Sequence, residues 1–511
     1  MENLIAGFQD ILTPANIAWV ALGVTIGYVV GVLPGLGKGT AVAVAIPLTY
    51  YISPLAAISL LIGIAKGSTA GSAVSAILLN TPGEPSSAPT ALDGYPLAQQ
   101  GKAQKALKMG LFASVIGDFI STLVLIVLAA PLAKYALLIG PVELCAILMF
   151  SLTFIGGLSG TSLTKGMIAA CFGILCSTVG LEIETAIPRL TLGVLELQDG
   201  LPLIPVAIGM LATAEMMVQM GNFRAIEKKS DLMGDNVARE DRVVLWSEWK
   251  LCIPAIARGT AIGTVVGILP GLGASVGSFL SYGATKKASK RPEMFGKGAL
   301  EGVAAAESAD NAVVPASLVP LFAIGIPGSV IAAILIAAFI IHGITPGPLM
   351  FVEQPRLVFG VYAAMICASL LLLCIGYFGL RFFSLVTKVP MSLIVPVVIF
   401  LCATGAFLQG DGLFGVVVML AFGVIGFFAK KLEFSFVTFL IGFVIGPSFE
   451  LTFRQSIALL NQDITQLIDR PIAVGFVLLT AVTIWRIAVA NSKKNRAQKN
   501  GDTIAQIQSA S

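Results

Sequence analysis

The chain has 511 residues, of which 56% are hydrophobic and only 12% are charged, and its mean hydropathy is +0.92. Soluble globular domains carry about a quarter charged residues, so this composition excludes that class and indicates an all-α integral membrane protein. The net charge of +4 is modest and the basic residues lie in loops, which excludes a nucleic-acid partner. One histidine, and seven cysteines without CxxC spacing, exclude a histidine-based metal centre, so we expect no metal site and no enzymatic activity.

The first sixteen residues contain no lysine or arginine and no cleavage site, so we expect no cleavable signal peptide. Apolar runs near the length that crosses a bilayer then follow one another, and we expect about 11–12 transmembrane helices in the lipid bilayer. The clearest runs are residues 17–33, 107–130, 141–158, 163–180, 201–220, 357–380, 391–408, 413–429 and 471–485.

Two apolar runs, one in each half of the chain, are interrupted by the same proline- and glycine-containing motif. GYVVGVLPGLG at residues 27–37 returns as GTVVGILPGLG at residues 263–273, with nine of eleven positions identical. Proline and glycine predict a broken or re-entrant helix at each place. Irregular backbone at membrane depth is tolerated only where it lines a cavity or is packed inside protein. The motif therefore predicts part of a binding site, and its duplication weighs against the alternative of a simple packing kink.

A second break follows each copy of the motif. In the first half, KGSTAGSAVS at 66–75 precedes LLNTPGEP at 78–85, and in the second half AAAESADNAVVPAS at 304–317 precedes AIGIPGS at 323–329. The same order of features predicts two transmembrane repeats with two breaks each. The expected division is a first repeat at 1–221, a charged cytoplasmic linker at 222–250, a second repeat at 251–465, a C-terminal transmembrane helix at 466–490 and a polar cytoplasmic tail at 491–511.

The charges of equivalent loops suggest how the two repeats are related. The loop after the first motif, at 50–56, has no basic residue, whereas the matching loop at 284–297 has five. After the second break the bias reverses, with three lysines at 99–108 and only Arg356 at 351–356. Because basic loops tend to stay cytoplasmic, this pattern predicts an inverted-topology repeat. The alternative is a parallel duplication whose loop charges have drifted.

The breaks free helix N-termini, which suit a carboxylate, and helix C-termini, which suit a cation. Lysines inside a membrane domain and hydroxyl or amide groups nearby would complete an anion site. The candidates for substrate binding are Gly35, Gly37, Lys38, Lys66, Ser68, Thr69, Ser72, Asn80, Thr81, Gly271, Gly273, Ser308, Asn311, Pro327 and Gly328. Glu307 and Asp310 are candidates for the coupling cation, with Asp118 in second rank. The alternatives are packing of small residues for the serines and threonines, and a structural ion pair or an interfacial position for Lys66 and Asp310.

The repeated GxxxGxLPGLG, the LLNTPG that follows GSTAGSAVSAI, and ADNAVVPASLVPLFAIGIPGS at 309–329 resemble the large membrane subunit of the tripartite tricarboxylate transporters (TctA-type). The resemblance extends from about residue 12 to about residue 485. It implies a multi-pass permease of the bacterial cytoplasmic (inner) membrane, working with a small four-helix membrane subunit and a periplasmic solute-binding protein.

The resemblance also implies the transport reaction. The permease would import di- and tricarboxylates such as citrate by secondary transport, without a cofactor, driven by a cation gradient that is expected to be Na⁺, with H⁺ as the alternative. A tripartite or stand-alone transporter or channel for another small organic anion remains open, because the broken helices would serve those equally well.

Overall fold

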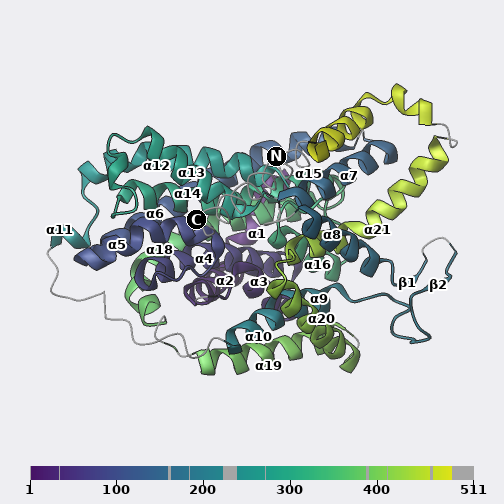
Figure 1. Cartoon of the computed structure of the whole chain (residues 1–511), viewed down its shortest axis with the longest axis horizontal. Helices are drawn as coiled ribbons and strands as arrows, with labels where there is room; N and C mark the ends of the chain where they lie inside the picture. Colours follow the sequence, from purple (N-terminus) through teal and green to yellow (C-terminus); the bar gives the residue numbers. More distant parts are fainter. Residues whose placement is uncertain are drawn as a thin grey trace, which may run out of the picture. The chain divides into compact units, whose positions relative to one another are not determined.

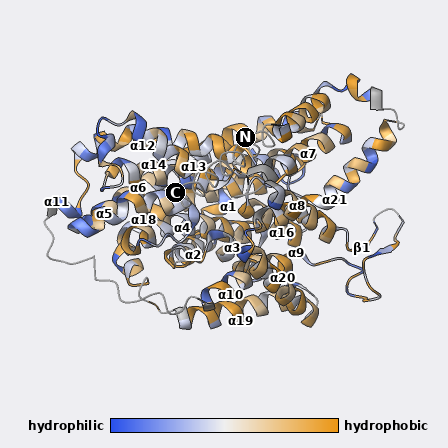
Figure 2. Cartoon of the chain, in the orientation of Figure 1, coloured by the Kyte–Doolittle hydropathy of each residue, from blue (hydrophilic) through white to orange (hydrophobic). Residues whose placement is uncertain are grey.

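The computed structural model describes residues 2–33, 35–137, 139–158, 163–182, 185–221, 239–270, 272–386, 389, 391–410, 412–460 and 464–485. Within these residues the chain is built from helices, and the one sheet is a short antiparallel pair, β1 (Gly180–Leu181) and β2 (Pro188–Arg189). Eight of the described helices are long and apolar enough to cross a membrane, and five shorter helices are also apolar (Figure 2). The all-α membrane fold is confirmed, and the count of 11–12 spans stays a prediction.

The helices form two compact units (Figure 1). The larger unit comprises residues 1–138 and 179–432 and holds both broken regions. The smaller unit comprises residues 139–178 and 433–511, of which the structure describes α7 (Pro141–Leu158), α8 (Leu163–Ser177), α21 (Phe436–Leu459), η5 (Ile464–Asp469) and a helix at 471–485. In the smaller unit α21 packs along α8 so closely that a Cβ atom at Gly173 would lie 2.1 Å from the carbonyl oxygen of Phe439.

Two helices of the first repeat, α2 and α4, begin with a hydroxyl cap followed by proline. Thr13 accepts a hydrogen bond from the N–H of Asn16 at the start of α2, and Ser53 accepts one from Ala56 at the start of α4. The elements are α1 (Glu2–Ile11), α2 (Pro14–Val32), α3 (Lys38–Thr49), α4 (Pro54–Leu79), η1 (Pro85–Ser87), α5 (Ala88–Leu97), η2 (Ala98–Lys102) and α6 (Ala103–Ala136). Both predicted breaks are present, between α2 and α3 and between α4 and η1.

The second repeat also has a glycine break, a small-polar helix and a Pro-Gly break in that order, with η4 before the small-polar helix α14 and α15 between α14 and the Pro-Gly break. Its elements are α12 (Trp246–Ile268), α13 (Gly273–Ala288), η4 (Pro292–Met294), α14 (Leu300–Ala316), α15 (Leu318–Ile324), α16 (Val330–Ile341), α17 (Met350–Glu353) and α18 (Pro355–Val386). The remaining elements of the larger unit are α9 (Leu203–Ile208), η3 (Gly209–Thr213), α10 (Ala214–Gly221), α11 (Arg239–Arg242), α19 (Met391–Gln409) and α20 (Leu413–Lys431). The repetition of broken helices is present, whereas the inversion of one repeat relative to the other stays a prediction.

The first glycines of the repeated motif hold two helices in close contact. A Cβ atom at Gly27 would lie 2.2 Å from the carbonyl oxygen of Ile64 on α4. At the equivalent Gly263, a Cβ atom would lie 2.3 Å from the carbonyl oxygen of Ala309 on α14. Such close approach of helix backbones is the use that membrane proteins make of small residues at i and i+4. The motif therefore has two parts: its first glycines pack α2 on α4 and α12 on α14, and its PGLG ends the helix.

The repeats also pack across each other. The long helix α6 of the first repeat packs against α14 of the second, and α18 packs against α2 and α4 (Figure 1). Asp93 on α5 reinforces this contact, since its Oδ1 accepts hydrogen bonds from the N–H groups of Gly296, Gly298 and Ala299 at 2.7–3.0 Å. In the first turn of α18, Arg356 forms two hydrogen bonds to Asp10 of α1, and these bonds lower the pKa of the Asp10 carboxyl.

Candidate functional site

The broken segments of the two repeats meet in pairs. The helix after each glycine break packs against the segment that follows the Pro-Gly break of the other repeat: α3 packs against α16, and α13 against η1. At the first contact, a Cβ atom added to Gly39 would lie 3.2 Å from Cγ1 of Val330. Gly39 is in the first turn of α3 and Val330 is the first residue of α16, so two helix N-termini lie together.

A charged cluster occupies the first of these breaks. The Lys38 ammonium lies 3.0 Å from Oε2 of Glu84 and 3.2 Å from Oδ1 of Asp310. The backbone N–H of Lys38, which opens α3, also donates to the Glu84 carboxylate. Glu84 belongs to the Pro-Gly break, so one carboxylate connects both breaks of the first repeat. It binds the helix N-terminus in the way that a carboxylate ligand would.

A second acidic group lies one helical turn away on α14. Glu307 is fully buried, and its carboxylate accepts hydrogen bonds from Thr90 of α5 at 2.6 Å and from Ser114 of α6 at 3.0 Å. Asn311 donates to Ser114 at 2.8 Å and to the Glu307 carbonyl at 3.0 Å. Glu307 and Asp310 are neighbours on α14 because residues three apart share a helix face.

The acids outnumber the cations in this part of the protein. Glu84, Glu307 and Asp310 are buried, and among the described residues Lys38 is the cation that forms ion pairs with them. The Oδ2 atom of Asp310 is buried without a hydrogen-bond partner. Burying unbalanced carboxylates is costly, so this arrangement suits a cation or protons more than a second anion. The described residues contain no group of three or more His, Cys, Asp or Glu side chains that could hold a metal ion by themselves.

Lys66 lies in a different network. Its ammonium is 2.8 Å from Oδ2 of Asp118 and also donates to a set of α6 and α18 acceptors at 2.8–3.1 Å: the carbonyl of Met365 and the hydroxyls of Ser369 and Thr122. Four acceptors surround three ammonium protons, and both charged side chains are 1% exposed. This geometry matches the structural ion pair that the sequence left open for Lys66, and contact of Lys66 with a substrate stays a prediction. One oxygen of Asp118, Oδ1, is buried without a partner.

The small polar residues fasten the Pro-Gly breaks to their helices. The hydroxyl of Ser72 bonds to that of Ser87, and in the second repeat Ser317 bonds to Ser329 at 2.9 Å. A Cβ atom at Gly328 would lie 2.5 Å from the Ser317 carbonyl oxygen. Thr69 and Ser308 donate to carbonyls of their own helices, whereas Ser68 has a buried hydroxyl without a partner.

The remaining candidates lie in or beside the segments where the helices are broken. Gly35 and Gly273 have φ angles of +83° and +72°, the left-handed region that favours glycine, and Gly37 is the N-cap of α3. Asn80 ends α4 in the same left-handed region, and both Asn80 and Thr81 are exposed. Pro327 is buried in the second Pro-Gly break. Gly271 lies outside the described residues.

Three residues that contact Lys38 or Glu307 are not among the candidates predicted from the sequence: Glu84, Thr90 and Ser114. Glu84 is the one charged residue in NTPGEP, and that position inside a predicted break was a usable signal. Thr90 and Ser114 carried no such signal, because only the packing of α5 and α6 against α14 brings them to Glu307.

Two repeats of broken apolar helices around a buried charged cluster define a multi-pass membrane protein of the transporter class. The chain belongs to the tripartite tricarboxylate transporter TctA family, whose family model matches residues 17–441. The chain is therefore a membrane subunit of a tripartite tricarboxylate transporter, a kind of system that includes other subunits. The family resemblance drawn from the sequence is confirmed.

Two proteins of Agrobacterium vitis are similar to the chain. One is an uncharacterized 52.8 kDa protein in the TAR-I ttuC' 3' region, 35% identical over 501 residues, which cover 97% of this chain and 98% of that protein. The other is an uncharacterized protein in the TAR-II ttuC' 3' region, 32% identical over 236 residues, which cover 46% of this chain and 98% of that protein. No solved structure matches the chain.

Proposed function

We propose that this subunit is the permease of a binding-protein-dependent secondary transporter that imports di- and tricarboxylates such as citrate, driven by a cation gradient. The observation that carries the proposal is the Lys38–Glu84–Asp310 cluster, which lies where the two breaks of the first repeat meet. Lys38 and the helix N-terminus beside it can bind an anion, and the carboxylates of Glu84 and Asp310 can bind a cation.

The cluster suggests how cation and substrate are coupled. In the structure the Glu84 carboxylate pairs with the Lys38 ammonium and accepts a hydrogen bond from the first N–H of α3. A cation, or protons, that neutralise Glu84 and Asp310 would release these two donors. A substrate carboxylate could then bind Lys38 and the adjoining N-termini of α3 and α16, where Ser329 provides a hydroxyl. Substrate would bind well only after the cation, which is the requirement for coupled transport.

The proposed partners are a small four-helix membrane subunit and a periplasmic solute-binding protein, in a bacterial cytoplasmic membrane. Their support is membership of a tripartite family. The proposed driving ion is Na⁺, with H⁺ as the alternative. A transporter for another small organic anion is the second candidate for substrate, since the paired helix N-termini and Lys38 would accept any small anionic group.

The test is uptake of radiolabelled citrate into proteoliposomes that contain this chain and its small partner, with the binding protein outside. We expect uptake to require both the binding protein and an inward Na⁺ gradient. Uptake driven by a proton gradient alone would identify H⁺ as the driving ion. Stronger competition by another carboxylate would identify that carboxylate as the substrate. Absence of uptake of every carboxylate under every gradient would refute the proposal.

A substitution links the activity to the cluster. We expect Asp310→Asn to lower gradient-driven uptake at least about tenfold, because the substitution removes the charge of a buried carboxylate that pairs with Lys38. A tenfold change corresponds to about 1.4 kcal/mol. Glu353→Gln, the same chemical change at an exposed position on α17, should leave uptake unchanged. Full gradient-driven uptake by Asp310→Asn would remove this residue from the coupling mechanism.

A further inference from the structure

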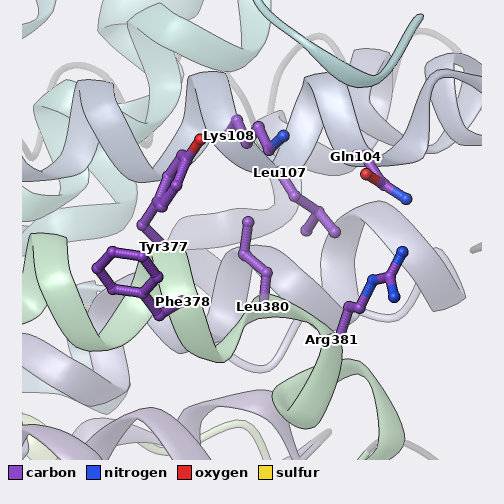
Figure 3. A pocket seen from close by; sticks show the side chains of 7 residues that line it. All are labelled: Gln104, Leu107, Lys108, Tyr377, Phe378, Leu380 and Arg381. Carbon is purple, nitrogen blue, oxygen red and sulfur yellow. The ribbon is translucent and has the colours of Figure 1, made fainter. Parts of the chain in front are cut away.

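A pocket lies where the long helices of the two repeats run side by side. Its volume is about 220 Å³, and it is lined by residues of α6 and α18. The lining residues used here are Gln104, Leu107 and Lys108 of α6 and Tyr377, Phe378 and Arg381 of α18. Figure 3 shows Arg381 and Gln104 at one end of the pocket and Lys108 with Tyr377 toward the other, with Leu107 between them. None of these residues belongs to the Lys38 cluster.

The pocket is lined by two cations and no carboxylate. Lys102, the last residue of η2, and Lys105 of α6 form ion pairs with Asp241 and Glu248 at 3.9 Å and 2.6 Å. Lys108, one turn further, donates instead to the backbone carbonyl of Arg242 at 2.8 Å, and no ion pair joins it to a carboxylate in the described part of the chain. With two basic side chains and no carboxylate in its lining, the pocket favours an anion.

The surroundings of the pocket are apolar and face outward. Phe378 is 84% exposed and Phe382, on the same helix, is 59% exposed, while Leu107, which also lines the pocket, is 3% exposed. The Lys108 ammonium lies over the Tyr377 ring, 5.6 Å from its centroid. Aromatic side chains beside basic ones, with large apolar surface exposed on a membrane helix, are typical of the interface between headgroups and acyl chains.

From this combination we infer that the pocket binds the headgroup of an anionic phospholipid, with its acyl chains against Phe378 and Phe382. The space equals that of roughly seven water molecules, enough for a phosphate group but not for a whole lipid. A soluble anion would use Lys108 and Arg381 equally well, but it would leave the exposed phenylalanines without a role. Basic pockets between membrane helices are known to select anionic headgroups. The lipid would join α6 to α18, the corresponding long helices of the two repeats.

The experiment uses the full chain in detergent micelles, with thermal unfolding and native mass spectrometry after addition of phosphatidylglycerol, phosphatidylcholine or inorganic phosphate. We expect phosphatidylglycerol to be retained and to raise the unfolding temperature, and the other two additions to have no such effect. Equal retention of phosphatidylcholine, or equal stabilisation by free phosphate, would overturn the inference.

Variants place the effect in the pocket. Lys108→Gln and Arg381→Gln should each weaken phosphatidylglycerol binding roughly fivefold, since a basic residue near an anionic surface contributes about 1 kcal/mol. Lys134→Gln, the same change at the exposed opposite end of α6, should not weaken binding. The charge-preserving Lys108→Arg should retain binding, which separates loss of charge from damage to the fold. Unchanged binding by the Lys108→Gln, Arg381→Gln double variant would overturn the assignment.

Discussion

Lys66 and Asp118 form an ion pair without access to solvent, since each side chain is 1% exposed. Removing one member of such a pair leaves the other charge buried and unpaired, which costs far more than the pair itself contributes. At this position the two charges also connect three helices, because Ser369 of α18 donates to Asp118 at 2.5 Å. The pair is therefore placed to hold α4, α6 and α18 in one arrangement.

We expect Lys66→Met to lower the free energy of unfolding by about 3–5 kcal/mol, and the double variant Lys66→Met, Asp118→Leu to recover most of that loss. Thermal unfolding of the purified variants measures both. A Lys66→Met protein as stable as the unaltered chain would contradict the structural role. If the double variant is folded yet inactive in uptake, the pair takes part in transport, through Lys66 or through Asp118, as the sequence predicts. If it is folded and active, the ion pair is structural alone.

At the scale of elements, the glycines of α12 decide how closely it packs on α14. Gly263→Ala would place a Cβ atom 2.3 Å from the Ala309 carbonyl oxygen, so the two helices must separate. We expect a loss of about 1–3 kcal/mol of stability, the usual cost of overpacking, seen as a lower unfolding temperature.

The matched control is Gly283→Ala on α13, where a Cβ atom would meet nothing within 4 Å. There alanine should stabilise the helix by up to about 1 kcal/mol because it loses less backbone entropy on folding. Glycine to alanine should therefore lower the stability of the protein at position 263 and raise it at position 283. Equal effects at both positions would show that α12 and α14 do not make the close contact described above.

The elements show what a single sequence can predict here. Both breaks of each repeat were predictable because proline and glycine act on their own backbone, within a few residues. The pairing of Lys66 with Asp118 was not, because it depends on which faces of α4, α6 and α18 meet. For Glu84 the sequence offers a signal, its charge inside a predicted break, but its pairing with Lys38 depends on the approach of the two breaks of the first repeat.

At the scale of the whole molecule, each repeat is completed by the other. The small-polar helix α14 packs against α6 of the first repeat, and α4 packs against α18 of the second. The paired breaks follow the same rule, with α3 against α16 and α13 against η1. This exchange has the form expected of two repeats related by a two-fold axis. An axis in the membrane plane would give an inverted repeat, and an axis along the membrane normal a parallel one.

The loop charges predict the inverted arrangement, and two equivalent residues can test it. Tyr51 follows α3 and Lys287 lies at the end of α13, at matching positions after the two copies of the motif, and both are exposed. In a background with the seven native cysteines replaced, we expect a membrane-impermeant maleimide added to intact cells to label Tyr51→Cys but not Lys287→Cys. Lys287 lies in a basic loop, which tends to stay cytoplasmic.

A second pair of positions reverses the expectation and so controls for differences in reactivity. Gln100, before α6, and Glu353, before α18, are exposed at corresponding places in the two repeats. Here the second-repeat position, Glu353→Cys, should be labelled in intact cells and Gln100→Cys only after permeabilisation. Labelling of Tyr51 and Lys287 from the same side would establish a parallel duplication. The N-termini of α3 and α13 would then open toward the same face of the membrane, and substrate release on the opposite face could not use the second copy of the break.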